Sequence, residues 1–312
     1  MFPLRRQVTA RLTTGFTQRG FGATTLRCCA ATQESAIPQH QWGSRQLNQL
    51  SFLSFAKRLS TKEHVEIAEN SYQTSQWNLE DARNVRVTHK EPEGMADRLA
   101  YGAVSLCRWG FDTFSLYRFG TLTERKVVNR CLFLETVAGV PGMVGGMLRH
   151  MTSLRRMEAD LGWIQTLLEE AENERMHLMT FVEIRQPGLV FRGCILVAQG
   201  IMFNLLLALY IVSPRFVHRF VGYLEEQAVI TYTDILGHIE KGELQFSATR
   251  VPPLAITYWG LDEKASFHDL INAIRADEAE HRVVNHTFAD MHSHNLCRNP
   301  NPFAVLKQTD SK

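Results

Sequence analysis

The chain has few cysteines and almost no β-strand signal. Only six of its 312 residues are cysteine, and no two are spaced as Cys-x-x-Cys, so neither a disulfide framework nor a structural zinc site is expected. Three of the six lie in apolar runs and are predicted to be buried free thiols. The alternation of apolar and polar residues that marks a strand is almost absent. These absences predict an all-α fold.

Acidic residues are missing from the first tenth of the chain. No Asp or Glu precedes Glu34, whereas residues 1–33 hold five arginines among many Thr, Ala and Gly residues. This composition is typical of a mitochondrial transit peptide; a disordered basic arm is the alternative. Removing residues 1–33 takes five positive charges from a formal net charge of +2 and leaves −3. The mature chain is therefore not expected to bind nucleic acid.

The remaining chain divides into three parts. Residues 34–94 are polar and interrupted by proline and glycine, and are predicted to be an N-terminal arm that could wrap a partner subunit. Residues 95–292 show helical periodicity and are predicted to form the bundle domain. Residues 293–312 are predicted to be a flexible C-terminal tail. The hydrophobic content of 45% is too low for a polytopic membrane protein.

Local signals place several helix ends within residues 95–292. Thr123 is the expected N-cap of a helix that runs through Arg149, and Thr152 or Ser153 is expected to start the next helix. Two later starts are predicted by Ser213-Pro214 and by the possible capping box Ser266-x-x-Asp269.

Glutamate and histidine recur with the spacing of a di-metal site. Two Glu-x-x-His pairs are each preceded by a helix with a lone glutamate, and the six residues are Glu135, Glu174, His177, Glu225, Glu278 and His281. Residues three apart share a helix face, so each pair can bind one metal. This ligand set is that of ferritin-like di-iron and di-manganese carboxylate bundles. Four carboxylates with two imidazoles suit Fe or Mn better than Zn or Cu(I).

A single Glu-x-x-His pair is expected by chance about once in a chain of this composition. The pattern is therefore informative only because of the sequence that surrounds these residues. Glu135 lies among apolar neighbours, and a buried carboxylate needs a partner. The alternative, a solvated helix face, suits Glu169, Glu170 and Glu172. We expect Glu135 and Glu225 to lie between the two metals as bridges.

Three further polar residues are candidates for supporting roles. Tyr232 lies seven residues after Glu225, on the same helix face, and could supply an electron and a proton during O–O cleavage; the alternative is a core tyrosine with a satisfied hydroxyl. Asn173 and Asp277 each precede a Glu-x-x-His pair and could hydrogen-bond the ligands or Tyr232. Polar residues on a helix surface are the alternative.

Residues 194–212 form an uncharged apolar run close to the length that spans a bilayer. A single crossing here would tend to place the ligands before and after it on opposite sides of the membrane. We therefore expect a helix that packs on the bundle and lays its outer face in one leaflet, an amphipathic, monotopic attachment. The basic residues expected at the headgroups are Arg118, Arg125, Lys126, Arg130, Arg149, Arg192, Arg215 and Arg219. The alternative is a core helix of a soluble bundle.

Four segments, in this order, resemble the signature boxes of the mitochondrial alternative oxidases, in particular the trypanosomal ones. They are LET at 134–136, NERMHL at 173–178, LEEQA at 224–228 and RADEAEHR at 275–282. The resemblance covers about residues 95–292. One departure is Gln227, where the third box usually has an acid, which puts the local charge near the quinol pocket in doubt.

The resemblance implies a cyanide-insensitive ubiquinol oxidase of the respiratory chain. It implies a ferritin-like four-helix bundle with two non-haem Fe ions per subunit, which couples the oxidation of two ubiquinols to the reduction of O₂ to water without proton pumping. A homodimer, monotopic on the matrix side of the inner mitochondrial membrane, is also implied. Cys28 and Cys29 lie in the expected transit peptide, so the thiol switch of plant relatives is not expected here.

The resemblance also implies roles for individual residues. The six Glu and His residues named above match the iron ligands, and Tyr232 matches the redox tyrosine. The matches to a supporting hydrogen-bond network are Asn173, Asp277 and Trp259. The matches to the quinol pocket are Arg108, Arg130, Leu134, Ala228 and Thr231.

Three other functions use similar chemistry. A di-iron quinone hydroxylase would have the same ligand types, but Tyr232 on the ligand face favours the oxidase. An iron-storage or ferroxidase bundle would form a soluble cage, which the apolar run 194–212 disfavours. A purely structural bundle would leave Glu135 unexplained.

Overall fold

The computed structural model describes residues 75, 77–117, 119–247 and 249–303. The chain separates into two units, Met1–Lys57 and Arg58–Lys312, and all of the first lies outside the described residues. The predicted transit peptide and most of the predicted N-terminal arm therefore also lie outside them. Within the described residues the chain is all-helical and contains no strand, as predicted.

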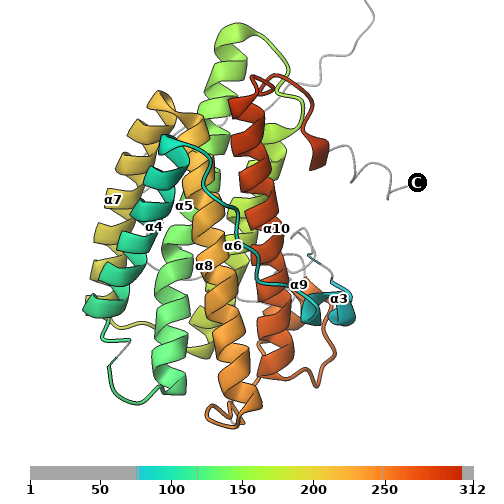
Figure 1. Ribbon diagram of the computed structural model, residues 1–312. Coiled ribbons are helices and arrows are strands. Elements are labelled where there is room, and N and C mark those ends of the chain that lie inside the picture. The colour runs from blue at the N-terminus through green and yellow to red at the C-terminus, as the bar shows by residue number, and fades with distance from the viewer. Residues whose placement is uncertain (1–74, 76, 118, 248, 304–312) are drawn as a thin grey trace, which may run out of the picture. The chain divides into compact units, whose positions relative to one another are not determined.

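Four long helices form a bundle, and four others pack around it (Figure 1). The helices of the described residues are α3 (Leu79–Arg83), α4 (Met95–Phe114), α5 (Glu124–Arg156), α6 (Trp163–Ile184), α7 (Leu189–Val212), α8 (Pro214–Glu240), α9 (Pro253–Trp259) and α10 (Phe267–Ser293). The bundle consists of α5, α6, α8 and α10, in which α5 packs along α6 and α8 packs along α10. Because each candidate metal ligand lies on one of these four helices, the bundle decides where the ligands meet.

Most of the predicted helix starts are confirmed. The Thr123 side chain accepts a hydrogen bond from the Lys126 amide, and Ser213 caps α8 in the same way. Both hydrogen bonds of the Ser266–Asp269 capping box are present at the start of α10. These side chains satisfy backbone N–H groups that have no partner within the helix.

The predicted helix start at Thr152 or Ser153 is wrong, because α5 continues through both residues to Arg156. The two hydroxyls do not cap a helix: Thr152 donates to the Leu148 carbonyl, and Ser153 donates to the Glu158 carbonyl. The helix ends instead at Met157, whose φ is 53°, and α6 begins after Gly162, whose φ is 93°. Left-handed residues of this kind end helices.

α5 and α6 approach each other closely through glycine. A Cβ added at Gly142 would lie 2.5 Å from the Leu167 carbonyl oxygen and 3.2 Å from the Ala171 Cβ. A side chain there would push the two helices apart. This approach brings Glu135 of α5 within reach of the ligands on α6.

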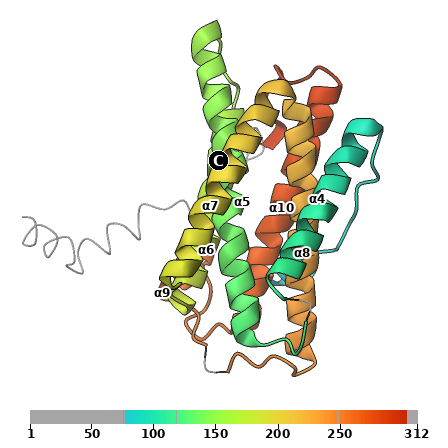
Figure 2. The same cartoon turned by 90° about the vertical axis from the view of Figure 1, so that its left-hand side faces the viewer.

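α4 and α7 lie on the same face of the bundle (Figure 2), and both expose large apolar side chains. α5 and α7 are both long and apolar enough to span a membrane. Half of the apolar 18-residue stretch of α5 is buried in the protein, whereas only 11% of the corresponding stretch of α7 is. The cysteines on α4, α5 and α7 also differ in their exposure to solvent. Cys131 on α5 is buried as predicted, but the prediction is wrong for Cys107 on α4 and Cys194 on α7, which are exposed.

Two of the basic residues expected at lipid headgroups are not available for that role. The side chains of Arg130 and Arg219 are almost fully buried, and they form ion pairs with Asp112 and Asp290, respectively. Arg118 lies outside the described residues. The predicted contact with lipid headgroups therefore rests on the remaining basic residues near the ends of α5 and α7.

The segment that follows α10 packs back onto the start of α6. Trp163 donates from its indole to the Asn299 carbonyl over 2.9 Å, and the Asn301 amide donates to the Leu161 carbonyl over 3.0 Å. Phe303 packs against Trp163 and Phe288 in one of the apolar clusters. The polar composition of residues 293–303 gave no sign of these contacts, and residues 304–312 lie outside the described part.

Candidate metal centre

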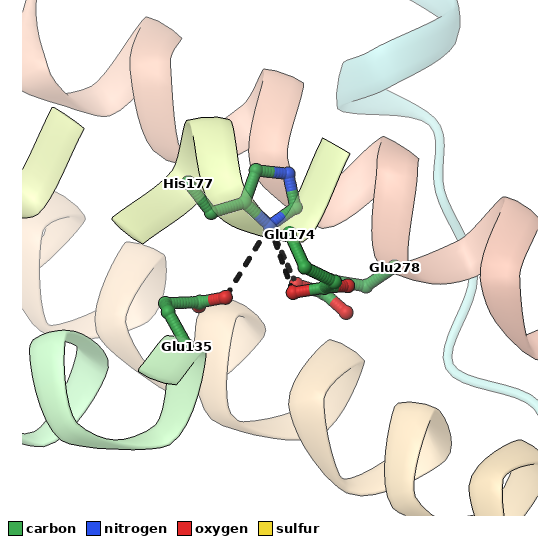
Figure 3. A group of neighbouring side chains, drawn as sticks. All are labelled: Glu135, Glu174, His177 and Glu278. Atoms are coloured by element: carbon green, nitrogen blue, oxygen red, sulfur yellow. Dashed lines mark ion pairs between the residues drawn. The ribbon is translucent and has the colours of Figure 1, made fainter. Parts of the chain in front are cut away.

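Each helix of the bundle contributes to one buried cluster of carboxylates and imidazoles. The ligands are Glu135 from α5, Glu174 and His177 from α6, Glu225 from α8, and Glu278 and His281 from α10. All six side chains are buried. Figure 3 shows Glu135, Glu174 and Glu278 gathered around His177, with their carboxylates turned toward its ring. The structure therefore brings together all six residues that the sequence pattern selected.

The cluster consists of two groups that share two carboxylates. Ligand atoms of Glu135, Glu174, His177 and Glu278 lie within 4.8 Å of one another, and so do those of the second group, which is Glu174, Glu225, Glu278 and His281. Glu135 and Glu225, which were expected to lie between the metals, each belong to one group only, so the grouping of the donor atoms favours other bridges. Glu174 and Glu278 are the shared residues and hence the candidate bridges. Each belongs to a Glu-x-x-His pair, so each pair contributes a shared carboxylate and a histidine.

The donor atoms of the cluster fit a pair of cations. Five of them have no hydrogen bond of acceptable geometry among the described residues and lie against one another as ion pairs instead: Glu135 Oε2, both carboxylate oxygens of Glu174, His177 Nδ1 and His281 Nδ1. Polar atoms that are buried without hydrogen bonds are costly, and a bound metal ion removes that cost. Four carboxylates also match the charge of two divalent cations, so the residues fit the group that the sequence pattern predicts.

Mutual repulsion of the carboxylates shifts their acidity. Burial and the nearby Glu174 raise the pKa of Glu135 well above its usual range, and burial together with Glu278 raises the pKa of Glu225. Burial acts the same way on Glu174, but the adjacent His177 and His281 outweigh it and hold the pKa of Glu174 low. In the absence of cations, protons bound to Glu135 and Glu225 therefore neutralise part of the negative charge of the cluster.

Metal-free protein is expected to lose stability as the pH rises. The folded-state pKa values of Glu135 and Glu225 are raised. The two groups therefore contribute fully to the free energy of unfolding below about pH 4.3, and this stabilisation is lost as the pH rises through their folded-state pKa values. His177 and His281, with raised pKa values, act in the same direction. The pKa of Glu174 is lowered, so its contribution to stability changes with pH only below about pH 4.3, where it is lost as the pH falls.

Calorimetry of metal-free and iron-loaded protein between about pH 5.5 and pH 8 measures this effect. The gap between the two melting temperatures should widen with pH, since metal binding also strengthens as the ligands lose their protons. A gap that stays constant or narrows would contradict this account of the cluster.

Tyr232 lies against the cluster and contacts one ligand directly. Its hydroxyl donates a short hydrogen bond to Glu135 Oε1, and the ring is 3% exposed. Burial and the adjacent Glu135 carboxylate raise the pKa of Tyr232, so the phenol keeps its proton. The interpretation that Tyr232 shares the ligand face is consistent with this contact, while its redox role stays a prediction.

Asp277 is the centre of a hydrogen-bond network behind the ligands. Its carboxylate accepts hydrogen bonds from Ser75, Trp77, Asn173, His177 and Trp259, over 2.6 to 3.1 Å. Because a carboxylate can only accept, Nε2 of His177 must donate, which leaves Nδ1 to face the cluster. Asn173 also donates to the Tyr258 hydroxyl. The alternative of polar residues on a helix surface is thus wrong for both Asn173 and Asp277. Among the described residues, neither forms a hydrogen bond with Tyr232, whose hydroxyl donates to Glu135.

The sequence reasoning missed two donors of this network, Ser75 and Trp77. Both lie about 200 positions before Asp277, in a segment that was predicted only as a polar arm. No local periodicity could reveal contacts over such a distance. The tryptophan itself was a usable signal, since a large aromatic residue in a polar arm often docks on the domain.

The residues matched to a quinol pocket lie on the α4, α5 and α8 side of the bundle. Arg108 donates to the Gln227 side chain over 2.6 Å, and Thr231 donates to the Gln227 carbonyl. Arg130 instead forms an ion pair with Asp112. Leu134 and Ala228 are half-buried. Gln227, the departure from the third box, is therefore the partner that holds Arg108.

The expectation of a solvated helix face is wrong for Glu170. Its side chain is buried, and both of its oxygens accept from Asn285 Nδ2. Glu169 and Glu172 are half-buried. Glu170 lies four residues before Glu174, so it shares the inward face of α6, a signal that could have found it.

Comparison with known proteins decides the family. The family model described as alternative oxidase matches residues 77–290, which include all six cluster residues and Tyr232. The chain belongs to the alternative oxidase family. The mitochondrial alternative oxidase of Trypanosoma brucei brucei is 59% identical over 279 residues, which cover 89% of this chain and 84% of that protein. The corresponding protein of Aspergillus niger is 46% identical over 81% of this chain and 74% of its own length.

A third relative, from Wickerhamomyces anomalus, is 40% identical over 84% of this chain and 82% of that protein. All three relatives are named as mitochondrial alternative oxidases. The resemblance drawn from the four boxes is therefore confirmed. Membership makes the chain an oxidoreductase of a mitochondrial terminal oxidase family, and the identity to the trypanosomal protein exceeds that to the two fungal ones.

Proposed function

We propose that this protein is a ubiquinol oxidase that reduces O₂ to water at two non-haem iron ions, is insensitive to cyanide and pumps no protons. The observation that carries the proposal is the pair of ligand groups joined by Glu174 and Glu278, within a chain of the alternative oxidase family. Each ubiquinol that becomes ubiquinone releases two electrons and two protons. Two ubiquinols thus supply four electrons and release four protons, which balance the four electrons and four protons taken up when one O₂ becomes two waters.

The residues of the site divide this work. Iron held by the six ligands would supply the redox chemistry toward O₂. Asp277 orients His177 through its ring nitrogen, while Tyr232 holds a proton against Glu135 and can give up that proton with an electron. Insensitivity to cyanide follows from a ligand set without haem.

We further propose that Arg108, Arg130, Leu134, Ala228 and Thr231 line the quinol pocket. Gln227 bonds the Arg108 guanidinium, and Asp112 bonds that of Arg130, so both groups are oriented before a substrate arrives. A guanidinium held in this way can donate to a quinol oxygen. Leu134 and Ala228 would contact the apolar part of the substrate.

The exposed apolar face of α4 and α7 supports attachment to the matrix side of the inner mitochondrial membrane by one leaflet. Large apolar side chains point outward along both helices: Leu99, Leu106, Trp109, Phe114, Leu196, Val197, Ile201 and Leu205. Exposed apolar side chains gathered on neighbouring helices of one face indicate contact with a partner or a membrane. Since ubiquinol dissolves in lipid, a monotopic homodimer on the membrane would receive its substrate laterally from the leaflet.

Replacing both Ile201 and Leu205 by Glu is expected to release the protein from membranes. Each exposed apolar side chain contributes roughly 1.5–3 kcal/mol when it leaves water, so co-sedimentation with vesicles should fall by at least about ten-fold. The matched control is Val283→Glu, a 48% exposed residue on α10, which should still sediment. Equal sedimentation of the double variant and the control would contradict attachment by this face.

Oxygen uptake by membranes that contain the protein tests the proposed activity. With ubiquinol as donor, uptake should continue when cyanide blocks haem oxidases. Loss of this uptake on adding cyanide, or its absence in iron-loaded membranes, would refute the proposal.

A further inference from the structure

A small cavity of about 120 Å³ lies between α6 and α10 and reaches the metal centre from outside the bundle. Acidic side chains, Glu169, Glu172 and Glu280, lie along it, and the cluster residue His281 forms part of its wall. Its volume is that of about four water molecules in the liquid, and its lining is polar enough to hold them. The cavity therefore offers a hydrated approach to the His281 side of the centre.

Glu170 also lines this cavity, but it belongs to neither ligand group. Its side chain is 7% exposed, and Asn285 Nδ2 donates to its two oxygens over 2.9 and 3.0 Å. The charged groups that act electrostatically on it are Glu174 on its own helix, Glu225 on α8, and Glu278 and His281 on α10. Burial, offset in part by His281, raises the pKa of Glu170 to about 7. Glu170 is thus a carboxyl group outside the ligand set that lines the cavity and can exchange a proton with its water.

A buried hydrogen-bond chain fixes the position of Glu170. Tyr210 on α7 contacts His218 Nε2 over 3.0 Å, and His218 Nδ1 contacts Asn285 Oδ1 over 3.1 Å. Burial lowers the pKa of His218 to about 3, so the ring is neutral. Because Asn285 donates from its nitrogen to Glu170, its oxygen must accept from Nδ1, and Nε2 then accepts from the Tyr210 hydroxyl. Every donor in this chain points toward Glu170.

The hydrogen-bond chain from Tyr210 through His218 and Asn285 orients Glu170, but it is a poor route for protons. An amide such as that of Asn285 does not readily take up and pass on a proton, so the path from Tyr210 is interrupted at Asn285. The cavity is not interrupted in this way, because Glu170 and His281 both lie on it. Protons from solvent would therefore reach the centre by way of the cavity.

We propose that Glu170 passes protons from this cavity to the Glu174–His281 side of the metal centre. The inference rests on the proposed function, in which the reduction of each O₂ takes up four protons at a buried site. In each transfer Glu170 would release its proton toward the Glu174–His281 side of the centre and take another from cavity water, so its own charge state is restored. The waters formed can leave through the same cavity.

The test compares iron-loaded Glu170→Gln, Glu170→Asp and wild-type protein in ubiquinol-dependent oxygen uptake. The Gln variant keeps the shape of the side chain and an acceptor for Asn285 but cannot carry a proton. Its kcat should fall by about 10²-fold, with unchanged KM for ubiquinol and unchanged iron content. The Asp variant should recover much of kcat, and added formic acid, which is small enough for the cavity, should raise kcat of the Gln variant. Glu183→Gln, an exposed acid at the far end of α6, is the matched control and should behave as wild type.

The outcomes separate this inference from the proposed function. If wild-type protein shows no ubiquinol-dependent uptake, the proposed function fails and the role of Glu170 fails with it. If wild type is active, three results overturn the role of Glu170 alone: full activity of Glu170→Gln, loss of its iron, or a low kcat that neither Asp nor formic acid restores. The last two would make Glu170 a structural support of the centre.

Discussion

Glu174→Ala is expected to abolish ubiquinol-dependent oxygen uptake and to empty the metal centre. Glu174 is one of two carboxylates that belong to both ligand groups, and both of its buried oxygens lack a hydrogen bond of acceptable geometry among the described residues. Its removal would take an oxygen ligand from both ligand groups at once, whereas Glu135→Ala and Glu225→Ala would each remove a ligand from only one group. Iron content should fall from about two per chain to near zero, measured by metal analysis of the purified protein.

The matched control is Glu183→Ala, which removes an exposed carboxylate from the same helix and should retain iron and activity. Altering a hydrogen-bond partner of a ligand typically lowers metal affinity or activity 10–100-fold, so Asp277→Asn should lie between the two. A Glu174→Ala variant that keeps both irons would contradict the assignment of Glu174 as the shared ligand. His281→Ala should lose iron from the second group first.

Tyr232→Phe is expected to abolish turnover while iron stays bound. The change removes one oxygen atom from a buried ring and one hydrogen bond to Glu135, and it leaves all six ligands in place. If Tyr232 supplies an electron and a proton, phenylalanine can supply neither, so oxygen uptake should fall by at least about 10²-fold. Uptake and iron content are measured on the same preparation, so loss of the redox group can be told from loss of metal.

Tyr101→Phe is the control for this prediction. Tyr101 lies on α4 with 37% of its surface exposed, and the loss of its hydroxyl should leave both uptake and iron unchanged. A Tyr232→Phe variant with near wild-type uptake would remove the redox role and would leave Tyr232 as a packing residue that hydrogen-bonds Glu135.

Four of the six cluster residues were predictable because Glu-x-x-His fixes their spacing on a helix, and Glu135 and Glu225 were predictable as lone acids on the helices that precede the two pairs. Glu-x-x-His places two ligands on one face whatever the rest of the chain does, and the caps at Thr123, Ser213 and Ser266 act within one turn. Local geometry does not say which carboxylates are shared, since that depends on how four helices meet. The choice of Glu174 and Glu278 over Glu135 and Glu225 therefore needed the structure.

Burial was harder to predict than helical structure. Glu170 lies in an acidic run that looks solvated, yet its position four residues before Glu174 turns it inward beside Asn285. The apolar periodicity of α4 and α7 indicated helices with an apolar face, but it could not say whether that face was covered. Cys107 and Cys194 were misjudged for this reason. Periodicity identifies a face, and only the packing of the other helices decides what lies against it.

The most direct test of the account is the stoichiometry of purified, iron-loaded protein supplied with ubiquinol and cyanide. Two ubiquinols should be consumed for each O₂, with ubiquinone and water as the only products. One ubiquinol per O₂ with hydrogen peroxide released, or oxygen incorporated into the quinone ring, would contradict a terminal oxidase. In the second case the same cluster of carboxylates and imidazoles would be assigned to a hydroxylase.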